Sequence, residues 1–141
     1  MNKLEEALKI AQTADVSTPA DSVVLYSISY QPTDENKRSA LEYMQNHPKC
    51  YMLDNTLCGQ KLMAMGLETD NHNPPQELMK IWAVASKRFI EAASGNITAF
   101  VNHADPRSTF VSVELPLILQ NSKIKHINNV DKFLFAEQFK L

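Results

Sequence analysis

The sequence contains little cysteine and no long apolar run, and both absences narrow the classes of protein to which it can belong. Cys50 and Cys58 are its only cysteines, too few for a disulfide framework. They do not form a C-x-x-C pair and the four histidines are scattered, so we expect no metal site. The longest apolar stretches are far too short to cross a bilayer, so we also expect no membrane span.

A dominant charge of one sign is absent as well. There are 14 Lys and Arg residues against 16 Asp and Glu residues, and no basic stripe, so the sequence gives no reason to expect nucleic acid as a partner. The opening residues are charged and amphipathic, unlike a secretory leader. We therefore expect a soluble protein, whose export would require a leader outside this sequence or another route.

The sequence does contain enough apolar residues for one domain. Its 141 residues are 44% hydrophobic and 21% charged, which suits a single globular domain over residues 1–141. Apolar residues at helical spacing predict helices in the opening segment and over residues 34–46, 55–65 and 74–93. Asn2 and Glu5 form a variant of the capping box for the first helix. Asn73 and Pro74 suit the start of the last one.

Short β-type runs dominate the second half. We predict strands over residues 97–101, 110–115, 124–127 and 132–135, and either a strand or a buried turn over residues 23–26. Residues 68–75 are rich in Asp, Asn and Pro and indicate a loop inside the domain. The predicted fold class is α/β, with a helical N-terminal part followed by a small, mostly parallel sheet with flanking helices.

Two segments of the second half carry residues that suit one kind of chemistry. Trp82 and Ser86 are four residues apart and share a helical face, and Glu114 ends a β-type run, where sites tend to gather. A pyridinium leaves as a neutral group without a proton, so its cleavage requires no pair of carboxylates. One carboxylate can stabilise the ribosyl cation, and an aromatic face can stack on the pyridinium. These residues therefore suit cleavage of a cationic N-glycosidic bond, such as that of NAD.

Each candidate also has an ordinary structural explanation. From pattern alone, Glu114 can be a solvated glutamate at a strand end, and Trp82 can be a core residue that packs its helix on the sheet. Asp54 can be only the N-cap of the helix at residues 55–65. Tyr26 lies in an apolar run and suits a core position with its hydroxyl at the surface.

Five segments, in order over roughly residues 23–128, resemble the ADP-ribosyl cyclase family. Residues 81–93 resemble the family helix F-W-x-x-x-S-x-x-[FY]-A-x-x-A, and residues 108–114 resemble the catalytic strand S-[TF]-F-G-x-x-E. The other three segments are residues 24–27, 53–59 and 95–102. The ordered set outweighs the structural explanations given above for Trp82 and Glu114.

The resemblance implies a role for each matched residue. Glu114 would be the catalytic carboxylate that holds the nicotinamide ribose and stabilises its cation, and Trp82 would position the nicotinamide. Asp54 would replace an acidic residue that contacts the nicotinamide amide, and Tyr26 would stack in place of a family tryptophan. The residues implied to bind the pyrophosphate are Ser27, Ser86, Thr109 and Phe110, the last two partly through backbone N–H groups.

The departures from the family pattern are also informative. Ile28 stands where some members have a phosphate-binding arginine, and Val111 replaces a glycine. The disulfides of the animal members are absent, so we expect a compact relative that resembles bacterial toxin domains. Such a domain would be secreted or delivered into a target-cell cytoplasm as part of a larger effector. NAD would be its substrate, with no cofactor, and a cognate immunity protein would be its partner.

The reaction implied is hydrolysis of NAD to nicotinamide and ADP-ribose. An ADP-ribosyl cyclase that makes cyclic ADP-ribose differs only in what captures the ribosyl cation, so it stays open, as does an inactive NAD-binding module. A protein ADP-ribosyltransferase is disfavoured because the S-T-S strand and the arginine motif of transferases are not recognisable.

Overall fold

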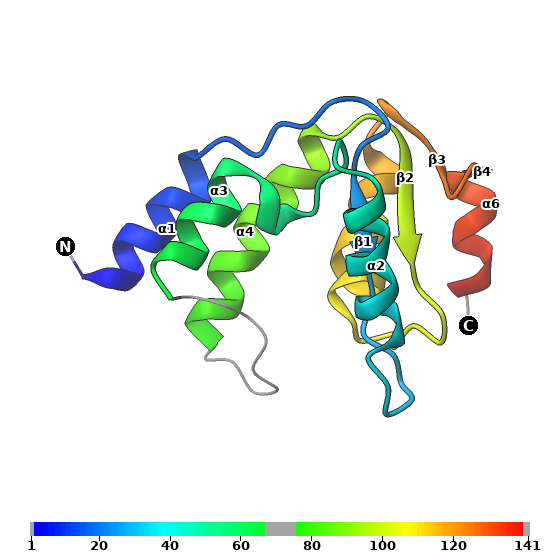
Figure 1. Cartoon of the computed structure of the whole chain (residues 1–141), viewed down its shortest axis with the longest axis horizontal. Coiled ribbons are helices and arrows are strands. Elements are labelled where there is room, and N and C mark those ends of the chain that lie inside the picture. Colours follow the sequence, from blue (N-terminus) through cyan, green and yellow to red (C-terminus); the bar gives the residue numbers. More distant parts are fainter. Residues whose placement is uncertain (1, 67–75, 140–141) are drawn as a thin grey trace.

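A helical part and a part built on a small sheet lie next to each other along the long axis of the protein (Figure 1). The computed structural model describes residues 2–66 and 76–139. The helical part contains α1 (Lys3–Thr13), α3 (Leu57–Ala64) and α4 (Gln76–Ala92). The loop predicted at residues 68–75 and the helix start predicted at Asn73 and Pro74 lie outside the described residues.

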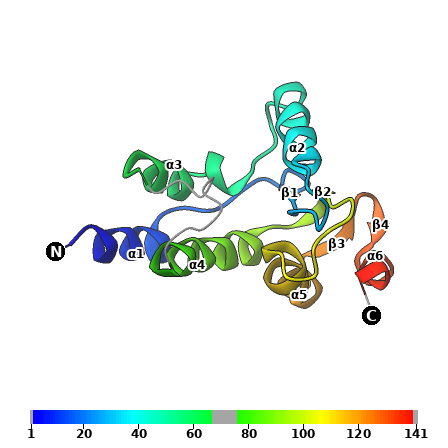
Figure 2. The same cartoon turned by 90° about the horizontal axis from the view of Figure 1, so that it is seen from below.

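Four strands form one sheet next to this helical part. In spatial order they are β1 (Val24–Tyr26), β2 (Gly95–Phe100), β3 (Ile124–Ile127) and β4 (Val130–Asp131). The first three are parallel and the last pair is antiparallel. Helix α2 (Glu35–Asn46) covers one face of the sheet and α5 (Leu115–Gln120) lies on the other (Figure 2). The predicted α/β fold with a helical N-terminal part and a small, mostly parallel sheet is confirmed.

Local sequence explains where the first helices begin. The Asn2 side chain accepts a hydrogen bond from the backbone N–H of Glu5 at 2.8 Å, as the predicted cap requires. Thr56 caps α3 by accepting from the backbone N–H of Gly59 at 3.1 Å. The N-cap of α3 is therefore Thr56, and Asp54 instead lies in the short 3₁₀ turn η1 (Leu53–Asn55) that precedes it.

Two apolar clusters lie on the two faces of the sheet. The main cluster joins α1, α3, α4 and α5 to the sheet and includes Leu25 and Trp82. The second cluster lies under α2 and contains Val24, Ala40 and Met52, with Tyr26 packed against it. Successive residues of a strand point to opposite faces, so β1 supplies both clusters.

The strand predicted at residues 110–115 is wrong, because these residues are helical. A π-helical turn, η2 (Phe110–Glu114), leads directly into α5. Ser108 Oγ accepts a hydrogen bond from the backbone N–H of Val111 at 3.1 Å, as a helix-capping side chain does. The β-branched and aromatic residues here have only a weak preference for strand, and capping and burial outweigh that preference.

The strand predicted at residues 132–135 is also wrong. Asn128 and Asn129 have φ values of 52° and 65°, which fits a tight two-residue hairpin turn between β3 and β4. The Asp131 carboxylate then accepts hydrogen bonds at 3.0 and 3.2 Å from two backbone N–H groups. This cap begins helix α6 (Lys132–Ala136), which the one-turn helix η3 (Glu137–Phe139) follows. Within the described residues, no helix is both long and apolar enough to span a membrane.

Candidate active site

Glu114 and Ser86 meet in the interior, where η2 packs on α4. Ser86 Oγ donates a hydrogen bond to Glu114 Oε2 at 3.3 Å, and each residue is 8% exposed. Ser86 belongs to the buried face of α4, which consists of Leu78, Ile81, Trp82, Ala85, Ser86, Phe89 and Ile90. Burying a carboxyl group among apolar residues is costly, and such groups gather at functional sites. The pair is therefore the centre of the candidate active site.

Burial sets the protonation of this carboxyl group. Burial raises the pKa of Glu114 to about 7, and the hydrogen bond from Ser86 acts in the opposite direction. The carboxyl group therefore gains and loses its proton near neutral pH. Among the described residues, the Ser86 hydroxyl is the group that favours its ionised form. A cationic ligand placed beside the carboxylate would favour that form further.

The π turn gives the helix of Glu114 an irregular backbone. The backbone N–H of Leu115 bonds to the carbonyl of Phe110, five residues earlier. Pro116 follows and has no N–H with which to continue the ladder of helical hydrogen bonds. Single π turns of this kind are frequent at functional sites. Glu114 is thus the last residue of a widened turn, two residues before the proline that interrupts the ladder.

Trp82 and Phe110 lie close to this pair in the sequence and are buried. Trp82 is one helical turn before Ser86 on the buried face of α4 and is 9% exposed. Phe110 is 1% exposed and packs edge-on against Phe139, with ring centroids 5.9 Å apart. Thr109 is exposed just before η2. The Phe110 side chain therefore belongs to the core, so its predicted contact with pyrophosphate could come only from the backbone.

The loops that follow β1 and β2 meet at one edge of the sheet, and the second of them leads into Thr109. Carboxyl ends of parallel strands share an edge, where ligands of α/β proteins bind. The Ser27 N–H donates to the Phe100 carbonyl at 3.0 Å, which extends the pairing of β1 with β2. A bridge between Ser29 and Ala104 then joins the two loops. Ser27 itself is buried, and its hydroxyl donates to the carbonyl of Ile28 at 2.8 Å.

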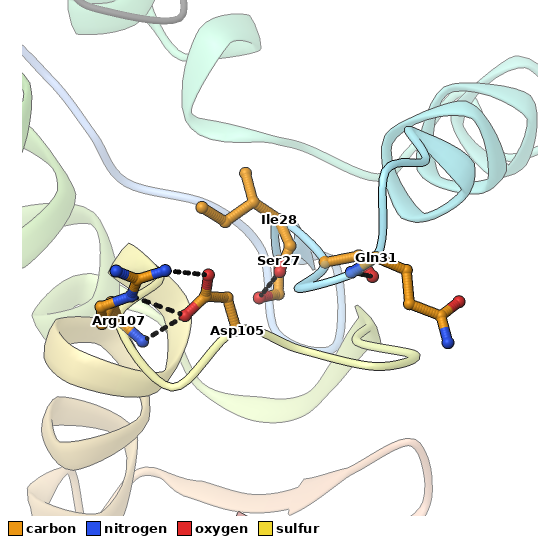
Figure 3. A network of polar contacts seen from close by, with 6 residues as sticks. Ser27, Ile28, Gln31, Asp105 and Arg107 are labelled. Carbon is orange, nitrogen blue, oxygen red and sulfur yellow. Dashed lines mark hydrogen bonds and ion pairs between the residues drawn. The ribbon is translucent and has the colours of Figure 1, made fainter.

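An arginine–aspartate pair lies beside Ile28 on the same edge (Figure 3). Asp105 N–H donates to the Ile28 carbonyl at 3.0 Å. The Arg107 guanidinium donates to both oxygens of the Asp105 carboxylate at 3.3 Å, and its side chain is 90% exposed. The hydrogen bond from Arg107 lowers the pKa of Asp105, so this carboxylate stays ionised. An oriented guanidinium thus stands next to Ile28.

Asp54 and Tyr26 come from segments that run alongside each other. Tyr51 pairs in parallel with Val23, so the chain enters η1 next to β1. Asp54 is exposed in η1, and this turn packs on α3 and α4. Tyr26 is half-buried at the end of β1. The roles predicted for both residues toward nicotinamide stay predictions.

Two polar features of this region were not predicted from the sequence. Asn36 is buried on α2 and bonds to the ends of β1 and β2, and its position four residues before buried Ala40 was the available clue. The Asp105–Arg107 pair is the other. Among the described residues, no three His, Cys, Asp or Glu side chains gather in an arrangement that could hold a metal ion.

No protein-family model matches the sequence, and no curated protein matches it. Several solved structures do. The Aplysia cyclase complexed with substrate NGD and product cGDPR matches with a TM-score of 0.54 and 21% identity, over 77% of this chain and 48% of the cyclase. Porcine CD38 with a covalent intermediate matches with a TM-score of 0.58 and 22% identity, over 92% of this chain and 72% of CD38. Apo porcine CD38 matches with a TM-score of 0.55 and 17% identity, over 97% of this chain and 78% of CD38.

The chain has the ADP-ribosyl cyclase fold. The family resemblance predicted from five short segments is therefore confirmed at the level of the fold. The chain spans about half the length of the Aplysia cyclase. Glu114 and Ser86 lie at the buried contact between η2 and α4 of this fold, and Trp82 lies on the buried face of α4.

Proposed function

We propose that this protein is an NAD glycohydrolase, which cleaves NAD to nicotinamide and ADP-ribose. The observation that carries the proposal is the buried Glu114 carboxyl group, hydrogen-bonded to Ser86 beside Trp82. The fold adds support, because the similar structures are of cyclases and CD38, including a cyclase with substrate NGD and CD38 with a covalent intermediate.

The proposed reaction begins with the bond between nicotinamide and C1′ of its ribose. The bonding electron pair goes to the pyridinium nitrogen, so nicotinamide leaves as a neutral molecule and no proton donor is needed. The positive charge that develops at C1′ is stabilised by ionised Glu114, whose low-dielectric surroundings strengthen the attraction. Water then adds to C1′ and loses a proton to solvent, giving ADP-ribose.

The other residues would bind and orient the substrate. Trp82 would stack near the pyridinium, since aromatic faces attract cations. The Thr109 and Phe110 backbone and the loop of Ser27 would hold the pyrophosphate at the edge of the sheet, where helix N-termini favour anions. Asp54 would contact the nicotinamide amide.

The test is incubation of the purified protein with NAD and separation of the products by chromatography. We expect nicotinamide and ADP-ribose from the wild type, and a rate at least about 10²-fold lower for Glu114→Gln, which removes the charge opposite the developing cation. Glu91→Gln, an exposed glutamate of α4, is the matched control and should keep full activity. If cyclic ADP-ribose is the main product, the protein is a cyclase and not a glycohydrolase. No loss of NAD would overturn the proposal and favour an NAD-binding module.

We also propose that the protein acts as a toxin domain that depletes NAD in a target cell and is blocked by an immunity protein. Both cysteines are free, and a fold that needs no disulfide suits a domain that acts in a reducing cytoplasm. Expression in the cytoplasm of a bacterial cell should lower NAD and stop growth, and Glu114→Gln should do neither. Unchanged growth despite NAD cleavage in vitro would contradict this biological role while leaving the enzymatic one.

A further inference from the structure

Asn36 connects three segments of the candidate site. It lies in the first turn of α2 and is only 4% exposed. Its Nδ2 donates hydrogen bonds to the Ser27 carbonyl at 3.0 Å and to the Asn102 carbonyl at 2.8 Å. Its Oδ1 accepts from the Asn102 backbone N–H at 3.0 Å. One side-chain amide thus joins α2 to the residue after β1 and to the loop after β2.

The chemistry of this contact is specific for an amide. The two carbonyls need donors and the Asn102 N–H needs an acceptor, and a carboxamide supplies both from one planar group. A carboxylate could accept from Asn102 but would place its charge next to two carbonyl oxygens. A buried backbone group that loses its partner costs about 1–3 kcal/mol. The contact therefore fixes the relative position of the two loops.

Both loops lead to the residues that the proposed function assigns to the pyrophosphate. The first contains Ser27 and Ile28, and the second contains Asp105 and Arg107 and leads into Thr109. The bond from Asp105 N–H to the Ile28 carbonyl shows that the loops also touch beyond Asn36. Asn36 belongs to α2, on the side of the second cluster, whereas Ser86 and Glu114 lie at the α4–η2 contact on the side of the main cluster.

We infer that Asn36 is a positioning residue for binding of the substrate pyrophosphate, an inference that rests on the proposed function. Asn36 acts through Ser27 and the loop of residues 102–108, and it does not touch the reacting atoms. Its loss should weaken substrate binding and leave the chemical step at Glu114 nearly unchanged. Replacing Asn36 should therefore mainly raise KM, whereas replacing Glu114 should lower kcat.

The packing of α2 makes the test feasible. Ala40 is fully buried in the second cluster, with Tyr43 and Met44 packed against it, so α2 has apolar contacts independent of Asn36. Asn46, exposed on the same helix, bonds only locally to the Glu42 carbonyl at 3.2 Å and is a matched control. Asn36→Asp and Asn36→Ser are the informative variants, because serine keeps one donor and one acceptor without a charge.

The experiment measures kcat and KM for NAD cleavage, and the calorimetric Kd for NAD in the Glu114→Gln background. We expect Asn36→Asp to raise KM and Kd about tenfold, with kcat changed less than about threefold, and Asn36→Ser to fall between it and the wild type. Asn46→Asp should resemble the wild type. The pH at which activity is half-maximal should not move, because Glu114 is not perturbed.

The possible failures are distinguishable. A purely structural role would lower the folded fraction, and with it the apparent kcat and the unfolding temperature, at an unchanged KM. That result, or unchanged kinetics in both variants, overturns the inference alone. A wild type that neither cleaves nor binds NAD overturns the proposed function. If Asn36→Asp does not fold, the KM of Asn36→Ser decides.

Discussion

The Ser86 hydroxyl donates its hydrogen bond to the Glu114 carboxyl group from one turn beyond Trp82 on the same buried face of α4. Helix α4 thus carries both the only tryptophan of the sequence and the serine that bonds to the buried Glu114 carboxyl group. Because helix geometry fixes residues four apart on one face, the relative placement of Trp82 and Ser86 needs no long-range contact.

Replacing Ser86 with alanine should change the pH dependence of activity. The hydroxyl lowers the pKa of Glu114 against the larger effect of burial, so its removal should raise that pKa above about 7. The ionised form that the reaction requires would then appear at higher pH. We expect the acid limb of kcat/KM to move to higher pH, so the variant loses more activity at pH 6 than at pH 8. Ser112→Ala, an exposed serine of η2, should leave the limb in place.

Glu114→Gln should stabilise the protein at alkaline pH. The pKa of Glu114 is raised from the 4.5 of a free side chain to about 7, so between these values the folded state binds more protons than the unfolded state. Stability is therefore lost as the pH rises from 4.5 to 7, by up to about 3 kcal/mol. Urea unfolding should show Glu114→Gln more stable than the wild type at pH 8 and nearly equal at pH 4.5. An equal difference at both pH values would contradict a buried, titrating carboxyl group.

Lys132→Met should destabilise the contact between α5 and α6. Lys132 is buried, and its Nζ donates to the carbonyls of Ile118 at 3.1 Å and Asn121 at 2.7 Å at the end of α5. Methionine fills similar space but leaves both carbonyls without this donor. We expect a loss of about 2 kcal/mol in urea unfolding. Lys125→Met, an exposed lysine of β3, should change stability by less than about 0.5 kcal/mol.

Arg88→Met should loosen the docking of α1 on α4. The Arg88 guanidinium donates to the carbonyls of Ala11 at 2.6 Å and Ala14 at 2.9 Å, at the C-terminal end of α1. The positive charge of Arg88 also interacts favourably with the negative, C-terminal end of the α1 helix dipole. We expect a loss of about 2 kcal/mol and faster hydrogen exchange in α1. Lys87→Met replaces the exposed residue next to Arg88 and should have little effect on stability. Equal losses of stability in both variants would show that the hydrogen bonds of Arg88 to the end of α1 are not the cause.

Local sequence predicted the elements whose apolar spacing is clear. The helix at residues 34–46 and the parallel strands fall close to where they were expected. The two wrong strands share a physical reason. Ser108 and Asp131 each begin a helix by capping it, and these caps outweigh short runs of aromatic and β-branched residues. Runs of four to six residues are too short for periodicity to decide between strand and helix.

Residues of the candidate site could be predicted only where they belong to a segment that resembles the family. The family resemblance predicts both Ser86 and Glu114 as site residues, but it assigns Ser86 to the pyrophosphate and Glu114 to a strand, so the hydrogen bond between them was not predicted. Asn36 could not be found in this way, because its partner Asn102 is 66 residues away and an asparagine near a helix start usually serves as a local cap. Long-range polar contacts of this kind depend on the tertiary fold.

The π turn before Pro116 also determines how this helix would tolerate a change in length. A π turn is equivalent to one residue inserted into a regular α-helix. Deleting one residue between Phe110 and Glu114 would therefore turn the bond from Leu115 N–H to the Phe110 carbonyl into a regular α-helical one. Phe110 and Glu114 would then be three residues apart and would still share a helix face. This turn thus holds one residue more than a regular helix needs while the Glu114 carboxyl group stays in the interior, so the helix should tolerate a one-residue deletion here better than an insertion.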